Sequence, residues 1–293
     1  MDNAKGTDQL QETDPSLKNY RDAVRNHWDP AEIDYKNDVE ALVDLDEVNF
    51  TVLRSVIAQI GLGEEDVVED LHPFFAITKT TSDAMFLSTQ QYEEAKHADF
   101  FTRYWYQAIN SAEDIRGMET TEPDDDQWLT ESYIAQSKRL NDDMNKLLDK
   151  RSPHDCARAF ANYHLTQEGI LFQSGFHWLR KMYNGNNIDN PRLPALMEGA
   201  AKISQDEARH VDYGVRKLTD LVEIEQIDPV EIDEHVSNVL PLIQDLLSTI
   251  ITPKSGKIDE KEIIMFMRKN HTKRMKNISK NNQFESFIDS ISN

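Results

Sequence analysis

Two short stretches with the same pattern, Glu94-Ala-Lys-His97 and Glu207-Ala-Arg-His210, decide the fold that this sequence predicts. Each places a carboxylate three residues before an imidazole. On an α-helix, this spacing puts the two side chains on one face, one turn apart. Because both stretches carry the same donor groups, we expect two helices that face each other and share one polar site.

A further glutamate interrupts an apolar stripe in each of two other helices. The first stripe advances in steps of three and four residues, which is typical of one helix face. Its members are Leu53, Ile57, Ile60, Glu64, Val67 and Leu71. Glu64 therefore faces the core, whereas Glu65 lies about 100° further round the helix and faces elsewhere. Glu168 is the second such residue, and its apolar neighbours include Leu171 and Phe172.

Four helices that carry these residues match the di-metal site of a ferritin-like four-helix bundle. The expected ligands are Glu64, Glu94, His97, Glu168, Glu207 and His210. Burial of four carboxylates without cations would cost many kcal/mol or force them to take up protons, and two metal ions remove that cost. Oxygen and nitrogen donors without thiolate suit iron or manganese, so redox chemistry with dioxygen is the expected activity. The alternative is a structural bundle whose Glu-x-x-His pairs are surface ion pairs.

The acid that precedes Glu207 has an expected role at the same site. An imidazole ligand needs a partner that fixes its tautomer and ring orientation. We expect Asp206 to be that partner for His97. The alternative for Asp206 is an exposed acid.

The rest of the chain predicts an all-α protein in which additional helices flank the bundle. Residues 1–25 are polar and are expected to be flexible, and residues 26–288 are expected to form a single domain. Gly61 and Gly63 weaken the first long helix locally. The apolar spacing predicts helices over residues 39–72, 82–109, 127–150, 152–183, 191–223, 230–251 and 259–287.

Composition excludes several classes of function. The chain has 293 residues, and 53 acidic against 32 basic residues give it a net charge of −21. Such a chain repels nucleic acid and anionic membranes. Its one cysteine, Cys156, allows no disulfide within the chain and no thiolate metal site. We find no secretory signal and no run of about 18 apolar residues, so the sequence predicts a soluble cytoplasmic protein.

Several of these motifs together resemble the ligand-binding oxidases, which are relatives of the small subunit of class I ribonucleotide reductase. The similar segments lie in roughly residues 25–225, and they are Trp28-Asp-Pro, Gly63-Glu64-Glu65-x-Val67, Glu94-Ala-Lys-His97, Tyr163-x4-Glu168 and Asp206-Glu-Ala-Arg-His210. The resemblance implies one manganese and one iron ion per chain, with a di-iron centre as the alternative, and it implies a homodimer. It also implies a long-chain fatty acid in a hydrophobic tunnel, with the carboxylate of the lipid at the metals. Leu171 and Phe172 could line such a tunnel, although their spacing is equally that of plain core.

In that family, oxygen activation leaves an ether cross-link between a valine β-carbon and a tyrosine oxygen. Val67, three residues after Glu64, and Tyr163, five residues before Glu168, match the family's positions. Val67 shares the stripe of Glu64, and its tertiary β-carbon is an easier target for hydrogen abstraction than a methyl group. Five residues turn a straight α-helix by about 140°, so Tyr163 requires a wide site face or an irregularity such as a π-bulge. The alternative is that both residues are ordinary core.

Three other functions remain open. A ribonucleotide reductase small (β) subunit commonly keeps a tyrosine four residues after the first ligand histidine, and here that position is Phe101. The same enzyme needs a tyrosine in its tail to relay a radical, and no tyrosine or tryptophan follows Tyr213. A ferritin-like metal store and a di-iron oxygenase that acts on a carrier-bound or aromatic substrate share the same ligand types.

Overall fold

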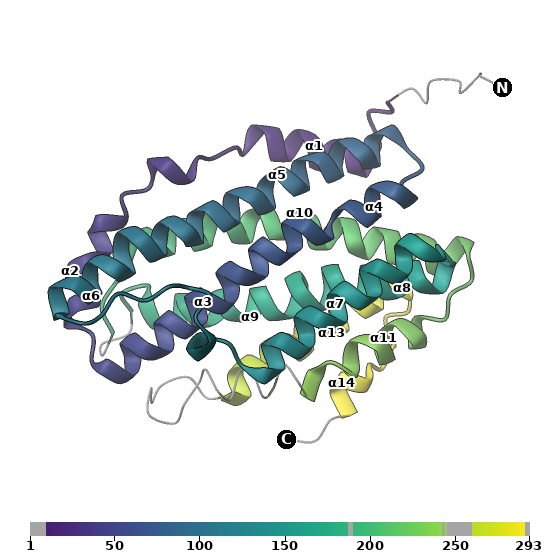
Figure 1. Cartoon of the computed structure of the whole chain (residues 1–293). Helices are drawn as coiled ribbons and strands as arrows, with labels where there is room; N and C mark the ends of the chain where they lie inside the picture. The colour runs from purple at the N-terminus through teal and green to yellow at the C-terminus, as the bar shows by residue number, and fades with distance from the viewer. Residues whose placement is uncertain (1–9, 187–189, 242–243, 245–259, 291–293) are drawn as a thin grey trace.

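Four long helical segments form the centre of the molecule (Figure 1). They are α3 (Glu47–Asp70), α5 (Thr81–Tyr104), α10 (Pro194–Ile224) and a composite segment made of α8 (Pro153–Phe160), η5 (Ala161–Phe172) and α9 (Gln173–Tyr183). In this computed structural model, which describes residues 10–186, 190–241, 244 and 260–290, all regular structure is helical. The predicted all-α class is confirmed.

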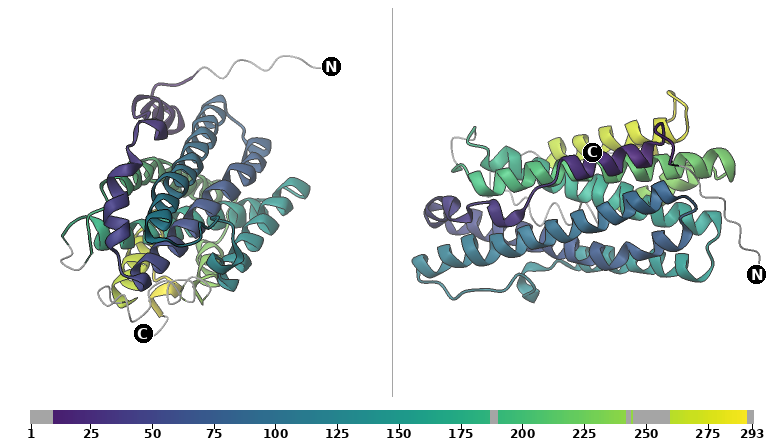
Figure 2. Two further views of the ribbon diagram at one scale, coloured as in Figure 1. Left: turned by 60° about the vertical axis from the view of Figure 1, so that its left-hand side comes forward. Right: turned by 90° about the horizontal axis from the view of Figure 1, so that it is seen from above.

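The four segments pack as two layers of a bundle. Helix α3 packs on α5, the π-helical segment η5 packs on α10, and α5 contacts α10 across the layers. Figure 2 shows the first half of the chain mostly in one layer and α10, with α13, in the other. One Glu-x-x-His turn lies near the middle of α5, and the other lies near the middle of α10. The contact between these two helices therefore brings the turns together.

Shorter helices flank this bundle, as the sequence predicts. They are α1 (Pro15–Arg25), α2 (Val39–Asp44), α4 (His72–Ile77), α6 (Asn110–Arg116), α7 (Glu131–Asp149), α11 (Pro229–Ser237), α13 (Glu260–Ile278) and α14 (Phe287–Ser290). Single turns and a π-helical joint complete the described structure, at η1 (Pro30–Glu32), η2 (Tyr35–Asp38), η3 (Trp105–Ile109) and η4 (Asp126–Trp128). Helix α7 packs on α3, and α13 packs on α10 and η5.

The N-terminal stretch departs from the prediction. Residues Pro15–Arg25 form α1 rather than irregular chain. Asp14 accepts hydrogen bonds from the backbone N–H groups of Ser16 and Leu17, which satisfies donors at the start of the helix. Leu17 is buried, and α1 packs on α5. The capping Asp14 and the following proline therefore favour the start of a helix, and packing on α5 stabilises it. Residues 1–9 lie outside the described residues, and the domain boundary at residue 26 stays a prediction.

The predicted helix over residues 39–72 is divided into α2 and α3. Asp46 lies between them and caps α3, because its side chain accepts from the backbone N–H of Asn49 at 2.9 Å. Helix α3 then continues without a break through Gly61 and Gly63. A β-carbon at Gly61 would lie 2.9 Å from the β-carbon of Phe101, and these glycines therefore allow neighbouring helices to approach α3 closely.

The core has the composition that the apolar stripes predict. Every member of the α3 stripe is buried, namely Leu53, Ile57, Ile60, Glu64, Val67 and Leu71, whereas Glu65 is exposed. The predicted helix over 230–251 begins as α11, and much of its second half lies outside the described residues. Of the helix predicted over 259–287, residues Glu260–Ile278 form α13, but the chain then turns, and the next helix, α14, begins at Phe287.

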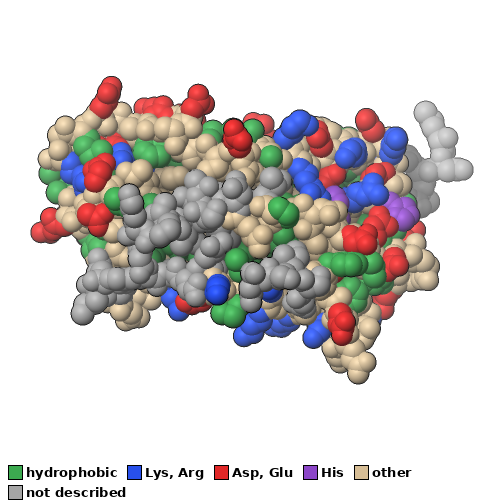
Figure 3. All heavy atoms as spheres, turned by 90° about the horizontal axis from the view of Figure 1, so that it is seen from below, with side chains coloured by type: hydrophobic (Ala, Val, Ile, Leu, Met, Phe, Trp, Pro, Cys, Tyr) green, Lys and Arg blue, Asp and Glu red, His purple; other side chains and the backbone are tan. Residues whose placement is uncertain are grey.

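The described surface carries charges of both signs. On the face in Figure 3, acidic and basic side chains are interspersed, so the described part of this face shows no continuous acidic surface. None of the helices in the described ranges combines the length and the hydropathy that a bilayer-spanning segment requires.

Candidate metal centre

All six predicted ligands converge in the middle of the bundle. Each side chain is 0% exposed. They come from all four central segments: Glu64 from α3, Glu94 and His97 from α5, Glu168 from η5, and Glu207 and His210 from α10. Their donor atoms fall into two groups, each with atoms within 4.8 Å of one another. The first group is Glu64, Glu94, His97 and Glu207, and the second is Glu94, Glu168 and His210.

The distances describe two adjoining halves, one around each imidazole. His97 Nδ1 lies 3.4 Å from Glu64 Oε2, 3.3 Å from Glu94 Oε2 and 3.3 Å from Glu207 Oε1. His210 Nδ1 lies 3.1 Å from Glu94 Oε1, 3.6 Å from Glu168 Oε1 and 3.7 Å from Glu207 Oε1. Glu94 turns one oxygen toward each imidazole, and Glu207 Oε1 lies near both. These two carboxylates therefore occupy the position of ligands that two cations would share.

Many buried oxygen and nitrogen atoms of this cluster, all able to bind a metal ion, have no hydrogen-bond partner among the described residues. These atoms are both carboxylate oxygens of Glu64 and of Glu207, Oε2 of Glu94 and of Glu168, and Nδ1 of His97 and of His210. An unsatisfied buried polar group costs about 1–3 kcal/mol, and more if it is charged. Cations placed among these atoms would satisfy them together, and the donors are the oxygen and imidazole types that iron and manganese bind. The residues therefore fit a pair of such ions.

Burial perturbs the carboxylates in a way that cations would reverse. It raises the pKa of Glu64 to about 8, although the imidazole of His97 opposes the shift. Burial and the charge of Glu207 together raise the pKa of Glu168. Burial also acts to raise the pKa of Glu94, but the neighbouring His210 and His97 hold it below its usual value. Burial therefore favours the neutral form of Glu64 and Glu168, whereas metal binding requires their carboxylate form and would displace a proton.

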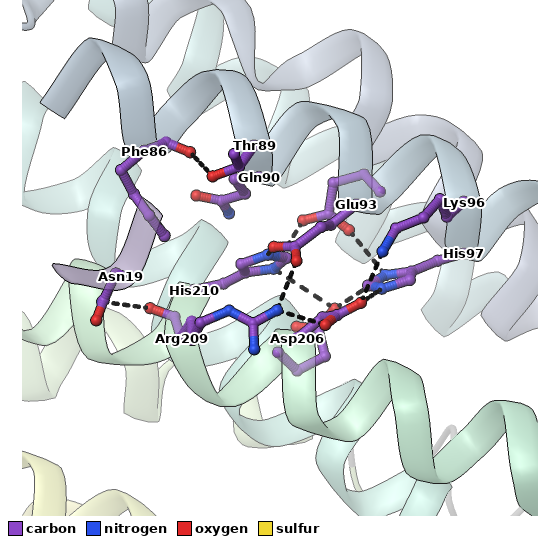
Figure 4. A network of polar contacts seen from close by, with 12 residues as sticks. Asn19, Phe86, Thr89, Gln90, Glu93, Lys96, His97, Asp206, Arg209 and His210 are labelled. Carbon is purple, nitrogen blue, oxygen red and sulfur yellow. Dashed lines mark hydrogen bonds and ion pairs between the residues drawn. The ribbon is translucent and has the colours of Figure 1, made fainter. Parts of the chain in front are cut away.

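Each imidazole is held from behind by an acid of the facing helix (Figure 4). His97 Nε2 lies 3.3 Å from Asp206 Oδ2, and His210 Nε2 lies 3.0 Å from Glu93 Oε2. Such partners fix the orientation of a ligand ring and increase its basicity. Asp206 faces His97 as the sequence indicated, but Glu93 is a site residue that sequence reasoning missed. The signal was available, because Glu93 precedes Glu94 just as Asp206 precedes Glu207.

Trp28 extends these contacts beyond the ligands. Its indole Nε1 donates to Asp206 Oδ2 at 2.8 Å. Its ring stacks on the His97 ring with 6.3 Å between centroids. The Trp28-Asp-Pro motif therefore reaches the site through Asp206.

The helix irregularity expected near Tyr163 is present. Residues Ala161–Phe172 form the π-helical segment η5. In a π-helix, hydrogen bonds join residues five apart, so Tyr163 and Glu168 share one face. The Tyr163 hydroxyl donates to Glu94 Oε1 at 3.4 Å, and both Tyr163 and Val67 are fully buried. The same region holds a second missed residue, Gln90, whose amide donates to Glu168 Oε1 at 2.9 Å.

This bundle, with four buried glutamates and two buried histidines at its centre, defines a di-metal carboxylate oxidoreductase. More specifically, the chain belongs to the ribonucleotide reductase small chain family, whose model matches residues 12–289. The family resemblance that the sequence motifs indicated is confirmed.

Solved structures of R2-like ligand-binding oxidases share the fold. A point mutant with an aerobically reconstituted Mn/Fe cofactor is 25% identical, with a TM-score of 0.79 over 92% of this chain and 95% of that chain. A second mutant with the same cofactor is also 25% identical, with a TM-score of 0.76 over 95% and 99% of the two chains. An anaerobically reconstituted mutant is 24% identical, with a TM-score of 0.81 over 94% and 99%.

Proposed function

We propose that this chain is a dioxygen-activating oxidase that holds one manganese and one iron ion between its six central side chains. The ligands would be Glu64, Glu94, His97, Glu168, Glu207 and His210. The observation that carries the proposal is the set of buried donor atoms in these residues that lack hydrogen-bond partners in the described structure. The Mn/Fe pair in similar R2-like ligand-binding oxidases supports this choice of metals over two irons.

The residues around the centre would have different roles in holding the two metal ions. A bound metal pair supplies the electrons that reduce dioxygen. Glu94 and Glu207 lie within reach of both imidazoles, so each could contribute to holding either ion. Asp206 and Glu93 hold the imidazole rings in place. Because every ligand is fully buried, the surrounding core excludes bulk water from the reaction.

We further propose that Val67 and Tyr163 become joined by an ether bond. The bond forms between the Val67 β-carbon and the Tyr163 phenol oxygen, with loss of one hydrogen from each residue. Two electrons leave with these hydrogens and pass to dioxygen, which is the oxidant. The burial of both residues and the contact of the Tyr163 hydroxyl with Glu94 support this assignment.

Anaerobic loading with manganese and iron, followed by exposure to oxygen, tests both claims. Elemental analysis should give two metals per chain. Intact mass should fall by two hydrogen masses after oxygen, and Tyr163→Phe should abolish that loss while it retains both metals. An unchanged mass in the fully loaded wild type would remove the cross-link, and a chain that binds no metal would remove the ligand set.

We propose a long-chain fatty acid as the organic ligand and a homodimer as the assembly. The similar solved structures are of ligand-binding oxidases, which supports a bound ligand in this chain. Lipids extracted from the purified protein should include fatty acids in near-stoichiometric amount, and oxygen consumption should respond to added fatty acid more than to aromatic amines. Analytical ultracentrifugation should show a dimer. A preference for aromatic amines would instead favour an oxygenase.

A ribonucleotide reductase small subunit is the second candidate, and one observation favours it. Trp28, Asp206 and His97 form a continuous hydrogen-bonded chain that leads outward from the centre. Such a chain could pass an electron between the metals and a partner subunit. Ribonucleoside diphosphate reduction, measured after the metal-loaded chain is mixed with a reductase large subunit, would support this candidate. Absence of turnover alongside cross-link formation would favour the oxidase.

A further inference from the structure

The backbone of η5 changes its hydrogen-bonding pattern next to Glu168. In an α-helix, the N–H of Gln173 would donate to the carbonyl of Gly169, four residues earlier. Here it donates instead to the carbonyls of Glu168, five residues earlier, and Ile170, three residues earlier. The carbonyl of Gly169, which directly follows a proposed metal ligand, therefore loses its α-helical donor.

A side chain from another helix supplies a donor in its place. Arg274 of α13 donates from Nη1 to the Gly169 carbonyl oxygen at 2.7 Å, a short distance that is typical of a charged donor. Gly169 is buried, and α13 packs on η5. Because a buried carbonyl without a donor is costly, the guanidinium compensates for the departure of this turn from α-helical geometry.

The contact also depends on the absence of a side chain at Gly169. A β-carbon there would lie 2.8 Å from Arg274 Nη1 and 2.8 Å from the backbone carbonyl oxygen of His164. His164 precedes Gly169 by five residues, which is the spacing of π-helical hydrogen bonds. Glycine therefore leaves room both for the guanidinium and for the wide turn of the backbone.

The guanidinium of Arg274 remains charged in this environment. Burial lowers the pKa of Arg274 to about 10, and the charge of Glu168 acts in the opposite direction. Arg274 therefore stays protonated at neutral pH. Its hydrogen bond to the carbonyl is charge-assisted, and such a bond is stronger than one between two neutral groups.

The direction of the Glu168 side chain depends on this turn. Its Oε1 atom accepts from the Gln90 amide at 2.9 Å and lies 3.6 Å from Nδ1 of His210. A π-helical turn closes over five residues, whereas an α-helical turn closes over four. If the N–H of Gln173 returned to Gly169, the turn would tighten and rotate Glu168 away from both partners.

We propose that Arg274 is a positioning residue, which holds the end of η5 in π-helical register and thereby keeps the Glu168 carboxylate at the metal centre. The inference rests on the proposed function only where it treats Glu168 as a ligand, because the contact with the backbone does not depend on a metal. It gives α13, which lies outside the four central segments, a direct part in shaping the centre.

Crystal structures of the metal-free protein test the proposal without any metal or turnover. Arg274→Met keeps a long side chain but removes the donor. Helix α13 should stay docked in this variant, because His271 on the same helix contacts Asp233 of α11 at 2.7 Å. A change at η5 would then report the lost hydrogen bond rather than the loss of the helix.

The helical register of η5 is the first measurement. In the wild type, the N–H of Gln173 should donate to the Glu168 carbonyl. In Arg274→Met it should return to the Gly169 carbonyl, and Glu168 should lose its contact with Gln90. A π-helical turn that survives unchanged in the variant would overturn the proposal, as would a wild type in which Arg274 does not reach Gly169.

Metal binding gives a second measurement. Arg274→Met should weaken anaerobic binding of Mn(II) about 10- to 100-fold, as is typical when a group that orients a ligand is removed. Calorimetric titration should show this loss for one of the two ions, because Glu168 belongs to one of the two donor groups.

Arg274→Lys tests whether the donor itself is what matters. Lysine keeps a charged donor of similar reach, and only one hydrogen bond has to be replaced. This variant should therefore retain the π-helical turn and most of the affinity for Mn(II). If Arg274→Lys loses both to the same extent as Arg274→Met, the hydrogen bond is not the cause and the proposal fails.

The matched control is Lys273→Met, which removes an exposed positive charge next to Arg274 on the same helix. It should leave the turn and the affinity unchanged. If it weakens binding as much as Arg274→Met does, the effect is one of general charge, and the proposal fails while the ligand set stands. If the wild type binds no Mn(II) but the turn still changes in Arg274→Met, the ligand set fails and Arg274 keeps only its role in the helical register.

Discussion

Two glutamates of the same bundle, Glu113 and Glu64, are both fully buried but have opposite surroundings. Glu113 Oε1 accepts from Arg54 Nη1 at 2.7 Å and from the Thr121 hydroxyl at 2.9 Å, and its Oε2 accepts from the Thr121 backbone N–H at 3.0 Å. Glu64 has neither oxygen in a hydrogen bond within the described residues.

The difference separates a structural carboxylate from one that is built to receive a cation. The chain itself supplies the positive charge at Glu113, because Arg54 on α3 is buried beside it. Helix α3 therefore carries a cation for Glu113 and, ten residues later, a second glutamate, Glu64, whose ion-pair partner in the described structure is the His97 imidazole. A buried carboxylate needs either a proton or a compensating charge. At Glu64 the raised pKa of about 8 favours the proton, which a bound cation would displace.

The largest expected effect is the loss of metal when a ligand of the centre is removed. His210→Ala should reduce the metal content from two ions per chain to at most one, because it deletes the imidazole that the described residues supply to its half. Glu168→Ala should do the same. Elemental analysis after anaerobic loading gives the measurement. His154→Ala, which removes an exposed imidazole paired with Glu231, is the control and should retain both ions.

The second prediction compares how replacement of Glu113 and of Glu64 changes the free energy of unfolding. Glu113→Gln should lower the free energy of unfolding by about 3–5 kcal/mol, because it leaves the buried Arg54 charge with only the more distant and exposed Glu47 carboxylate, at 3.7 Å, as its acidic partner. Glu64→Gln should change the metal-free chain by less than about 1 kcal/mol, since Glu64 has no hydrogen bond to lose and its raised pKa of about 8 already keeps it largely protonated. Urea unfolding of the metal-free proteins at neutral pH measures both. Equal losses would remove the distinction between the two clusters.

The third effect concerns the contact of α1 with the bundle and depends on pH. Burial acts to raise the pKa of Asp83, but the charge and hydrogen bond of Lys217 and the hydroxyl of Ser16 hold it below its usual value. The unfolded chain therefore binds this proton at higher pH than the folded chain does. The stabilisation is complete above about pH 4 and is lost as the pH falls through the folded pKa.

Asp83→Asn removes that contribution. It should cost about 1–3 kcal/mol at neutral pH and should reduce the acid dependence of unfolding below about pH 4. Unfolding measured across that range gives the slope. An unchanged slope in the variant would show that Asp83 is not the group responsible.

The smallest effect is expected at a solvent-exposed pair on α7. Lys138 and Asp142 lie 2.7 Å apart, one helical turn from each other, and both are largely exposed. Asp142→Asn should change the free energy of unfolding by no more than about 0.5 kcal/mol. A loss as large as that at Glu113 would mean that burial is not what distinguishes the buried clusters.

Periodicity predicted the parts of this protein in which local pattern and tertiary packing agree. The α3 stripe places Glu64 inward and Glu65 outward, as steps of three and four residues require. The irregularity at Tyr163 was one of two arrangements that the family resemblance required, because five residues turn a straight α-helix by about 140°. Helix α1 was missed, because most of its residues are polar and its few buried residues are covered by packing on α5.

Partners across the bundle were harder to foresee. Glu93 was missed because its role depends on which helix faces α5. Its position before Glu94, which matches that of Asp206 before Glu207, does not by itself show that Glu93 contacts the histidine of the other helix. Gln90 lies on the expected stripe of α5, but its contact with Glu168 depends on the π-helical turn of η5.

The amino-acid sequence by itself determined the helical class, the two Glu-x-x-His turns and the donor types, because these depend on spacing within single helices. Only the tertiary structure decided that the turns meet, that Glu93 of α5 contacts His210 of α10, and that Arg209 donates to Glu93. These contacts join residues more than a hundred positions apart, and their geometry depends on how helices pack rather than on how each one repeats.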